Sequence, residues 1–282
     1  MDKWRRTWTV CGSTWMESVG KLPFFMSLLV VVVLSGVSTF EYYQMVVPFT
    51  GKVTIVEVLA NIVNTPYSYF VILGGLFVYL MQAPYFSRGD ALLLPRLGRG
   101  PWIWGKALFV AGYCLLALGL TYLFALFICA PFIDFARLDW TPDFVNQYYL
   151  GEHLAEVAPA TILLQTIGLN YLFLLLMAFL AMLLNLCYSR VVAIVVAGGV
   201  CVSSSVITMV FPLLSRWGLA LQASIRYHQF MGQDNIAVGA LQMLPTVPES
   251  LLLFAAGCVL CLILIRYRVR NYDFQLESKG MH

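Results

Sequence analysis

The chain has 282 residues, of which 61% are hydrophobic and only 11% are charged. Soluble domains carry about 25% charged residues, so this composition excludes an ordinary soluble globular protein. The 17 basic and 14 acidic residues give a formal net charge of +3. We interpret residues 1–282 as a single all-α integral membrane domain that is surrounded by lipid, and we expect no nucleic-acid partner.

The N-terminal segment, residues 1–21, predicts an amphipathic helix at the membrane interface. Aromatic and apolar side chains recur there at helical spacing on one face, namely Trp4, Trp8, Cys11, Trp15 and Val19. Such a helix would lie along the membrane surface before Pro23 marks the turn into the first apolar run. A simple surface anchor explains the same composition equally well.

Six runs without Asp, Glu, Lys or Arg follow, and each predicts a membrane span. They cover residues 22–40, 58–87, 107–133, 157–189, 191–215 and 250–265. A helix needs about 20 apolar residues to cross a bilayer, within a range of roughly 17 to 25, so the first five runs are long enough and the sixth is marginal. The sequence therefore predicts six spans.

The connection 87–106, SRGDALLLPRLGRGPWIWGK, is basic but contains an apolar cluster. We expect a short helix that begins near Asp90, which suits a helix N-terminus, and that stops before Pro95. Leu92, Leu93 and their neighbours would then face lipid or a partner, because apolar residues in a connection need a cover.

Within this connection, GPWIWGKA at residues 100–107 has the G-x-x-x-x-G-K spacing of a phosphate-binding loop. It does not follow a strand, and Ala107 replaces the Ser or Thr that would bind the metal ion. No segment between the spans is long enough to hold an ATP-binding domain. We interpret the stretch as a membrane-interface anchor, with Trp102 and Trp104 at the entrance of the third span and Lys106 snorkelling beside them.

The later segments offer mild polar residues. The acidic, aromatic-rich segment 134–156 predicts a short surface helix that starts at Thr141-Pro-Asp143. Gln165 and Asn170 in the fourth span and Ser204 in the fifth could line a substrate path, although such residues more often serve helix packing.

The spans contain no ionisable residue, which counts against an ion-coupled transporter. We find no metal-ligand cluster and no Ser–His pair at one depth, so we expect no catalytic residue in this chain.

Basic residues divide unequally between alternate connections. If the N-terminus is cytoplasmic, 13 of the 17 lie on the cytoplasmic side and 4 on the other side. The positive-inside rule then places both termini in the cytoplasm. The seven Trp residues agree with this topology, because all lie in connections or beside the ends of the runs.

The 87–106 connection resembles the corresponding loop of ABC-2-type permeases, the membrane subunits of ATP-driven exporters. That family has a loop of the form G-T-L-E-L-L-L-x-x-P-x-x-R, followed after a short gap by G-K. This chain has Gly89-Asp-Ala-Leu-Leu-Leu-Pro95, then Arg99, then Gly105-Lys106. The six spans, the amphipathic first helix and the inside termini are also similar to the family.

The resemblance implies a permease subunit in a bacterial plasma (inner) membrane, working as a homodimer or heterodimer. A separate cytosolic ATP-binding subunit would hold ATP and Mg, with no cofactor in this chain. The family's loop forms a coupling helix, which assigns partner coupling to Gly89, Asp90, Leu92, Leu93, Arg96 and Arg99. Residues 216–249 resemble the pair of short outer helices that the family folds back between spans five and six, and 250–282 would form the last span and a basic tail.

A different class of function also fits the spans. A non-transporting membrane scaffold or immunity protein, which sequesters a peptide or anchors a complex, explains the spans and the outer connections. It leaves the apolar leucines of the 87–106 connection without a purpose.

Overall fold

The computed structural model describes residues 2–50, 52–62, 79–85, 88–141, 157–210, 218–225, 228 and 245–270. Its helices are α1 (Lys3–Val19), α2 (Leu22–Thr50), α3 (Ile55–Ile62), α5 (Arg88–Leu97), α6 (Arg99–Cys129), the 3-10 helix η1 (Ala130–Phe132), α9 (Pro159–Cys187), α10 (Arg190–Val210), α11 (Leu219–Gln222) and α13 (Val247–Arg270). In the described part of the chain the only β pairing is an isolated bridge between Val53 and Ile133. The predicted all-α class is confirmed at this level.

Three of these helices are long and apolar enough to cross a membrane: Arg99–Phe132, Pro159–Cys187 and Val247–Arg270. A fourth is added if α1 and the first part of α2, which meet at an angle of 78°, are counted as one bent span. The chain is therefore built as a membrane protein with three to four helices of spanning length among the described residues. Most of the predicted second span, the residues after Thr141 in the predicted surface helix and most of 216–249 lie outside those residues.

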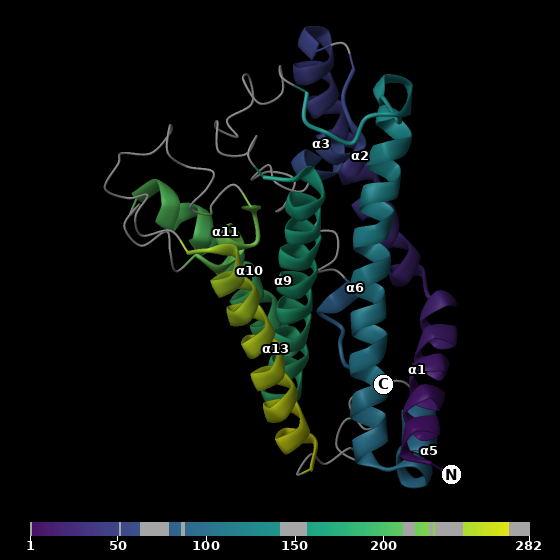
Figure 1. Cartoon of the computed structure of the whole chain (residues 1–282). Coiled ribbons are helices and arrows are strands. Elements are labelled where there is room, and N and C mark those ends of the chain that lie inside the picture. Colours follow the sequence, from purple (N-terminus) through teal and green to yellow (C-terminus); the bar gives the residue numbers. More distant parts are fainter. Residues whose placement is uncertain are drawn as a thin grey trace.

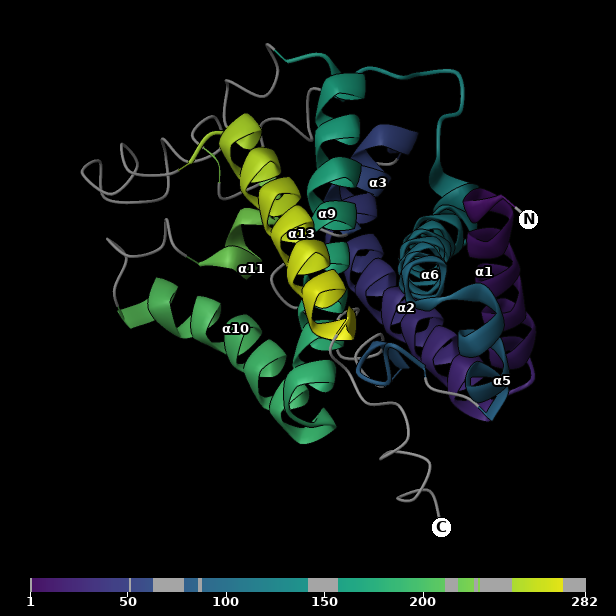
Figure 2. The ribbon, with the colours of Figure 1, turned by 90° about the horizontal axis from the view of Figure 1, so that it is seen from below.

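The helices form one bundle around α9. Figure 1 and Figure 2 show α13 and α10 on one side of α9, with α6, α2 and α1 on the other. Helices α9 and α13 pack closely at Gly257, where an added Cβ would lie 2.8 Å from a methyl carbon of Leu176. Phe173 and Phe254 meet beside this contact, with ring centroids 5.6 Å apart. Small residues at helix crossings are typical of membrane bundles, where close packing drives association.

The predicted N-terminal helix is confirmed as α1, but its predicted apolar face is divided between two environments. The residues that pack on α6 and are buried are Thr7, Val10, Cys11, Thr14 and Ser18. Trp4 and Trp8 instead point outward. The reason is the close approach of the two helices, because an added Cβ on Gly105 would lie only 2.5 Å from the Cβ of Val10.

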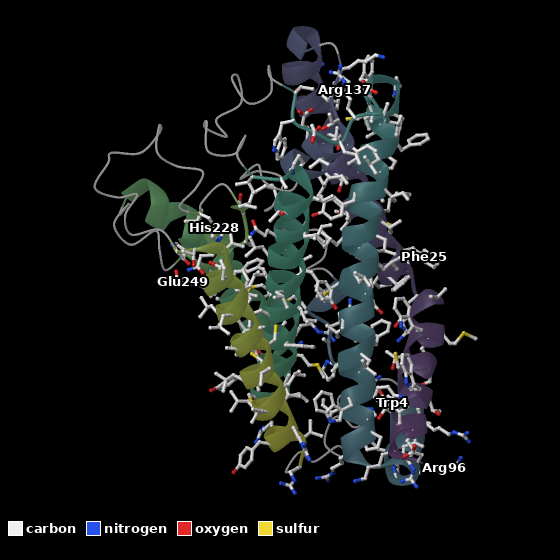
Figure 3. The ribbon with its side chains drawn as sticks, viewed as in Figure 1. Trp4, Phe25, Arg96, Arg137, His228 and Glu249 are labelled. Atoms are coloured by element: carbon white, nitrogen blue, oxygen red, sulfur yellow. The ribbon has the colours of Figure 1, made fainter. Side chains whose placement is uncertain are left out.

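The bundle has two distinct ends. One end contains the start of α1, the whole of α5 and the last turn of α13 (Figure 1). We call it the basic end. Arg268 donates a hydrogen bond from Nε to the Leu186 carbonyl at 3.3 Å, so α9 also finishes here. Figure 3 places Arg96 at the basic end and Arg137 at the opposite end.

The helix predicted in the 87–106 connection is present, but it does not stop before Pro95. Helix α5 runs from Arg88 to Leu97 and contains Pro95. It ends at Gly98, whose φ of +85° falls in the left-handed region that favours glycine. The Gly98 N–H donates to the Leu94 carbonyl at 2.9 Å, which completes the last turn beyond the proline.

Candidate functional site at the basic end

A buried ion pair joins α5 to α6. The Lys106 ammonium lies 3.0 Å from Asp90 Oδ2, and the Trp102 indole N–H donates to Asp90 Oδ1 at 2.8 Å. Asp90, Lys106 and Trp102 are 4%, 1% and 0% exposed. Both carboxylate oxygens therefore have a partner, as a buried charge requires.

Local sequence explains how these three groups meet. Trp102 and Lys106 are four residues apart on α6, so they lie on the same face of that helix. Asp90 lies in the first turn of α5, and the turn at Gly98 folds α5 back against α6. We call α5, Gly98 and the first two turns of α6 the elbow.

The anchoring prediction was wrong for Trp102 and Lys106. Both were expected at the membrane surface, with Lys106 snorkelling toward water. Instead they point into the protein, because Asp90 supplies the opposite charge that lets the ammonium remain buried. Trp104, Trp4 and Trp8 are exposed and are free to meet lipid headgroups. Trp15 is half-buried, and its ring packs on Phe109 at 4.8 Å between centroids.

The turn before α5 is tied to the rest of the bundle. Lys106 donates a second hydrogen bond to the Tyr85 carbonyl at 3.0 Å. From α9, the Asn185 amide donates to the carbonyls of Met81 at 2.7 Å and Ala83 at 2.6 Å. The elbow is thereby linked to two helices of membrane-spanning length.

The residues predicted for coupling occupy different environments in the elbow. Asp90 is buried, Leu93 is half-buried against the core, and Arg96 and Arg99 are exposed. Gly89 and Leu92 lie in α5, but the burial of these two residues is outside what the structure describes. Leu93 and Leu94, which were expected to face lipid or a partner, are half-buried and pack in part against the chain's own core.

Arg99 also contacts α13. Its guanidinium donates from Nη1 to the Val269 carbonyl at 3.4 Å and to the Arg270 carbonyl. Cationic side chains stabilise the carbonyl end of a helix, so Arg99 fastens the start of α6 to the end of α13. Sequence reasoning missed this contact because 170 residues separate the two groups.

At the start of α13, the structure brings together a histidine and a serine that sequence analysis did not pair. His228 Nε2 lies 3.1 Å from Ser250 Oγ, and His228 Nδ1 lies 3.1 Å from the Ser224 carbonyl. The Ser224 carbonyl accepts from Nδ1–H, so Nε2 carries no hydrogen and competes with the Gln222 amide oxygen, 3.2 Å from Ser250 Oγ, for the one hydroxyl hydrogen of Ser250. The contact lies outside the predicted spans, since His228 belongs to the 216–249 segment (Figure 3 labels His228).

The distance between His228 and Ser250 is that of a general base and its hydroxyl, but the two side chains are not accessible to solvent or to a substrate. His228, Ser250 and the neighbouring Gln222, whose amide oxygen lies 3.2 Å from Ser250 Oγ, are all buried. Burial lowers the pKa of His228 to about 4, so the imidazole is neutral at pH 7. The arrangement is a polar network that fastens the segment around α11 to the start of α13.

The predicted path residues lie on α9 and α10. Asn170 is buried and donates to the Thr166 carbonyl at 2.7 Å, within its own helix. Among the described residues, the side-chain oxygens of Gln165, Thr166 and Asn170 have no hydrogen-bond partner. Ser204 lies in α10, and its side chain is outside the described part.

Within the ranges that the structure describes, no group of three or more His, Cys, Asp or Glu side chains could hold a metal ion. The comparisons give no relative to which the site could be matched: no family model, curated protein or solved structure matches this chain.

Proposed function

We propose that the chain is the permease subunit of an ATP-driven exporter, with the elbow receiving force from a separate ATP-binding subunit. The observation that carries the proposal is the Asp90–Lys106 pair, which joins the connecting helix α5 to the head of a membrane-length helix. A helix that transmits force must be fixed to the element that it moves. A buried, fully hydrogen-bonded ion pair provides such a connection, because separating its two groups would leave a charge buried without its partner.

Packing around the elbow favours the same role. Helix α1 packs on the first turns of α6, with Val10 directly against Gly105, and Asn185 holds the turn before α5 from α9. A displacement of α5 would therefore be passed to α1, α6 and α9 together, since close-packed helices shift as units. The part of the elbow left for a partner is its exposed tip, which includes Pro95 and Arg96.

The finer features of the proposal come from the sequence. The chain has six spans, with the basic end and both termini in the cytoplasm of a bacterial cell, and it pairs with a second permease subunit. ATP and Mg bind to the partner. The unpartnered oxygens of Gln165, Thr166 and Asn170 on α9 are among the groups in a membrane-length helix that a polar substrate or water would satisfy.

The test is purification of the full chain from the cells that produce it naturally, in mild detergent, with mass spectrometry of the bound proteins and an ATPase assay. Arg96→Glu reverses an exposed charge at the tip without touching the buried pair. Arg137→Glu makes the same change at the opposite end, where the side chain of Arg137 is exposed and forms a surface ion pair with Asp134 of little energetic value.

We expect an ATP-binding subunit to purify with the wild type and with Arg137→Glu, and to be lost from Arg96→Glu. A chain that purifies without any ATPase from several detergents would contradict the proposal and favour the scaffold function. An ATPase that stays bound equally to all three forms would show that the tip of the elbow is not the coupling surface.

A further inference from the structure

Three buried side-chain oxygens on one short stretch of α9 have no hydrogen-bond partner. They are Gln165 Oε1, Thr166 Oγ1 and Asn170 Oδ1, which are half of the six such atoms in the described part of the chain. Thr166 and Asn170 are fully buried, in a helix of membrane-spanning length. Native proteins pair most buried polar atoms, because such an atom loses its hydrogen bonds to water on burial. A cluster of three indicates a place where another molecule supplies the missing partners.

The Thr166 hydroxyl differs from other buried threonine hydroxyls of this chain. Thr14, Thr39 and Thr121 each donate to the carbonyl four residues earlier, at 2.8, 2.6 and 3.0 Å. This bond is the usual one for a threonine inside a helix. The Thr166 hydroxyl does not make it. Both its hydrogen and its lone pairs are therefore available to a ligand.

The Asn170 side chain is oriented by its own helix. Its Nδ2 donates to the Thr166 carbonyl at 2.7 Å, and the amide oxygen is thereby directed away from that carbonyl. Thr166 and Asn170 are four residues apart and lie on the same face of α9. Gln165 is half-buried and follows Leu164, which is 71% exposed. The three oxygens therefore extend from the interior of the bundle toward the outward-facing side of α9.

These oxygens lie at a polar level of the bundle. Gly168, which lies between them in the sequence, packs on α13, because an added Cβ would lie 3.4 Å from Cδ2 of Leu251. Ser250 precedes Leu251, so the polar network around Ser250 is at the same level. The next level toward the basic end is apolar, since it contains the buried rings of Phe173 and Phe254.

The polar groups of α9 are neutral, and this selects the kind of ligand. Helix α9 contains no Asp, Glu, Lys or Arg. A charged ligand inside the membrane would need an opposite charge. The amide oxygens of Gln165 and Asn170 only accept hydrogen bonds, whereas the Thr166 hydroxyl both donates and accepts. Neutral hydroxyl groups complement this set, because each can donate to an amide oxygen or accept from Thr166.

We propose that this stretch of α9 binds a neutral amphiphile with at least two hydroxyl groups, which bond to Gln165, Thr166 and Asn170. The apolar part of the molecule would lie along the outward-facing side of α9, beside Leu164. The inference rests on the proposed export function, for which such a molecule is the substrate class. Because Thr166 and Asn170 are fully buried, the ligand enters when α9 separates from its neighbours. Buried water shares the hydrogen-bonding chemistry but has no apolar part.

The test measures binding of 1-monoolein, a neutral lipid with two hydroxyl groups, by native mass spectrometry. The full chain is purified in detergent, stripped of lipid and titrated. Methyl oleate carries the same acyl chain without a hydroxyl, and oleylamine carries a cationic donor instead.

The variant Thr166→Val/Asn170→Leu removes two of the three unpartnered oxygens with little change in volume. Its matched control, Thr7→Val/Thr14→Val, removes two buried hydroxyls of α1 that donate to backbone carbonyls. Thermal unfolding establishes that both variants are folded, and Thr166→Val alone replaces the double variant if that one is not.

We expect one 1-monoolein to bind about tenfold more tightly than methyl oleate or oleylamine, which corresponds to about 1.4 kcal/mol. The affinity should fall by about the same factor in Thr166→Val/Asn170→Leu, and the control variant should bind like the wild type. Equal binding of 1-monoolein and methyl oleate would overturn the proposal and assign the oxygens to buried water. Tighter binding of oleylamine, or equal weakening in the two variants, would also overturn it.

This measurement does not require the ATP-binding subunit. A chain that retains its ATPase but does not distinguish 1-monoolein from methyl oleate refutes the ligand site alone. A chain that binds 1-monoolein as expected but purifies without an ATPase contradicts the export function and leaves the binding site supported.

Discussion

The two ends of the bundle each bury a carboxylate, and they stabilise it in different ways. At the basic end Asp90 faces a full opposite charge on Lys106 and accepts from the Trp102 indole. At the opposite end Glu57 is fully buried, and its donors among the described residues are neutral: the Thr54 N–H at 2.8 Å, the Thr141 N–H at 2.5 Å and the Thr141 hydroxyl at 2.8 Å.

This difference follows from what each carboxylate joins. Glu57 closes a capping box at the start of α3, where Thr54 Oγ1 accepts from the Glu57 N–H at 3.4 Å, and it holds the nearby segment at Thr141. Asp90 joins two helices through side chains alone. A full charge pair gives a stronger and more selective connection between two helices, whereas neutral donors suffice to hold a connecting segment in place.

The largest expected effect is at the basic end. Lys106→Met removes the ammonium and leaves Asp90 buried without its counter-charge, which should cost about 3–5 kcal/mol of stability. Unfolding in mixed detergent micelles measures the loss. The double variant Asp90→Asn/Lys106→Met removes both charges and should be less destabilised than Lys106→Met alone. If the double variant is instead as unstable as the sum of the two single variants, the pair is not coupled as the structure indicates.

Removing the Glu57 carboxylate at the opposite end should lower the stability by a smaller amount. Glu57→Ala takes the acceptor from three donors and should cost about 2–3 kcal/mol, since each buried unsatisfied donor costs about 1 kcal/mol or more. The chain contains a matched control, because Thr246 and Glu249 form the same capping box, with distances of 2.8 and 3.4 Å, in an exposed position.

Glu249→Ala should therefore cost only about 0.5–1 kcal/mol. Hydrogen exchange at Thr141 should rise in Glu57→Ala and stay unchanged in Glu249→Ala. An equal loss of stability in the two variants would show that the burial of Glu57 does not increase the stabilisation that its hydrogen bonds provide.

The smallest expected effect is a pH dependence of the polar network at the start of α13. Burial lowers the pKa of His228 to about 4 in the folded state, below its ordinary value of 6.5. The unfolded chain therefore takes up the proton first as the pH falls, so stability is fully present above pH 6.5 and is lost progressively between pH 6.5 and about 4.

At pH 5.5 this loss should be on the order of 1 kcal/mol, since one pKa unit corresponds to about 1.4 kcal/mol. Hydrogen exchange of residues 219–225 between pH 8 and pH 5.5 measures it. The variant His228→Gln should remove the pH dependence of that segment, and a wild-type profile that is flat over this range would contradict the buried neutral imidazole.

Local sequence was sufficient to predict three membrane-length helices and two shorter ones among the described residues. Low charge and long apolar runs dictate membrane-length helices, and 107–133, 157–189 and 250–265 correspond to α6, α9 and α13. The amphipathic N-terminal helix and the short helix at Asp90 were also predicted, because helical spacing and an acidic first turn are properties of neighbouring residues.

Which side chains face each other was decided only by the tertiary structure. Sequence placed Lys106 and Trp102 at the membrane surface, since an isolated lysine or tryptophan near a span is most stable there. The turn at Gly98 brings Asp90 against them, and one opposite charge reverses their preference from the surface to the interior. The Ser250–His228 contact and the Arg99–Val269 hydrogen bond likewise join residues that are 22 and 170 positions apart. The sequence by itself determined the elements because helix formation depends on near neighbours, and the fold determined the contacts because charge pairing depends on distance in space.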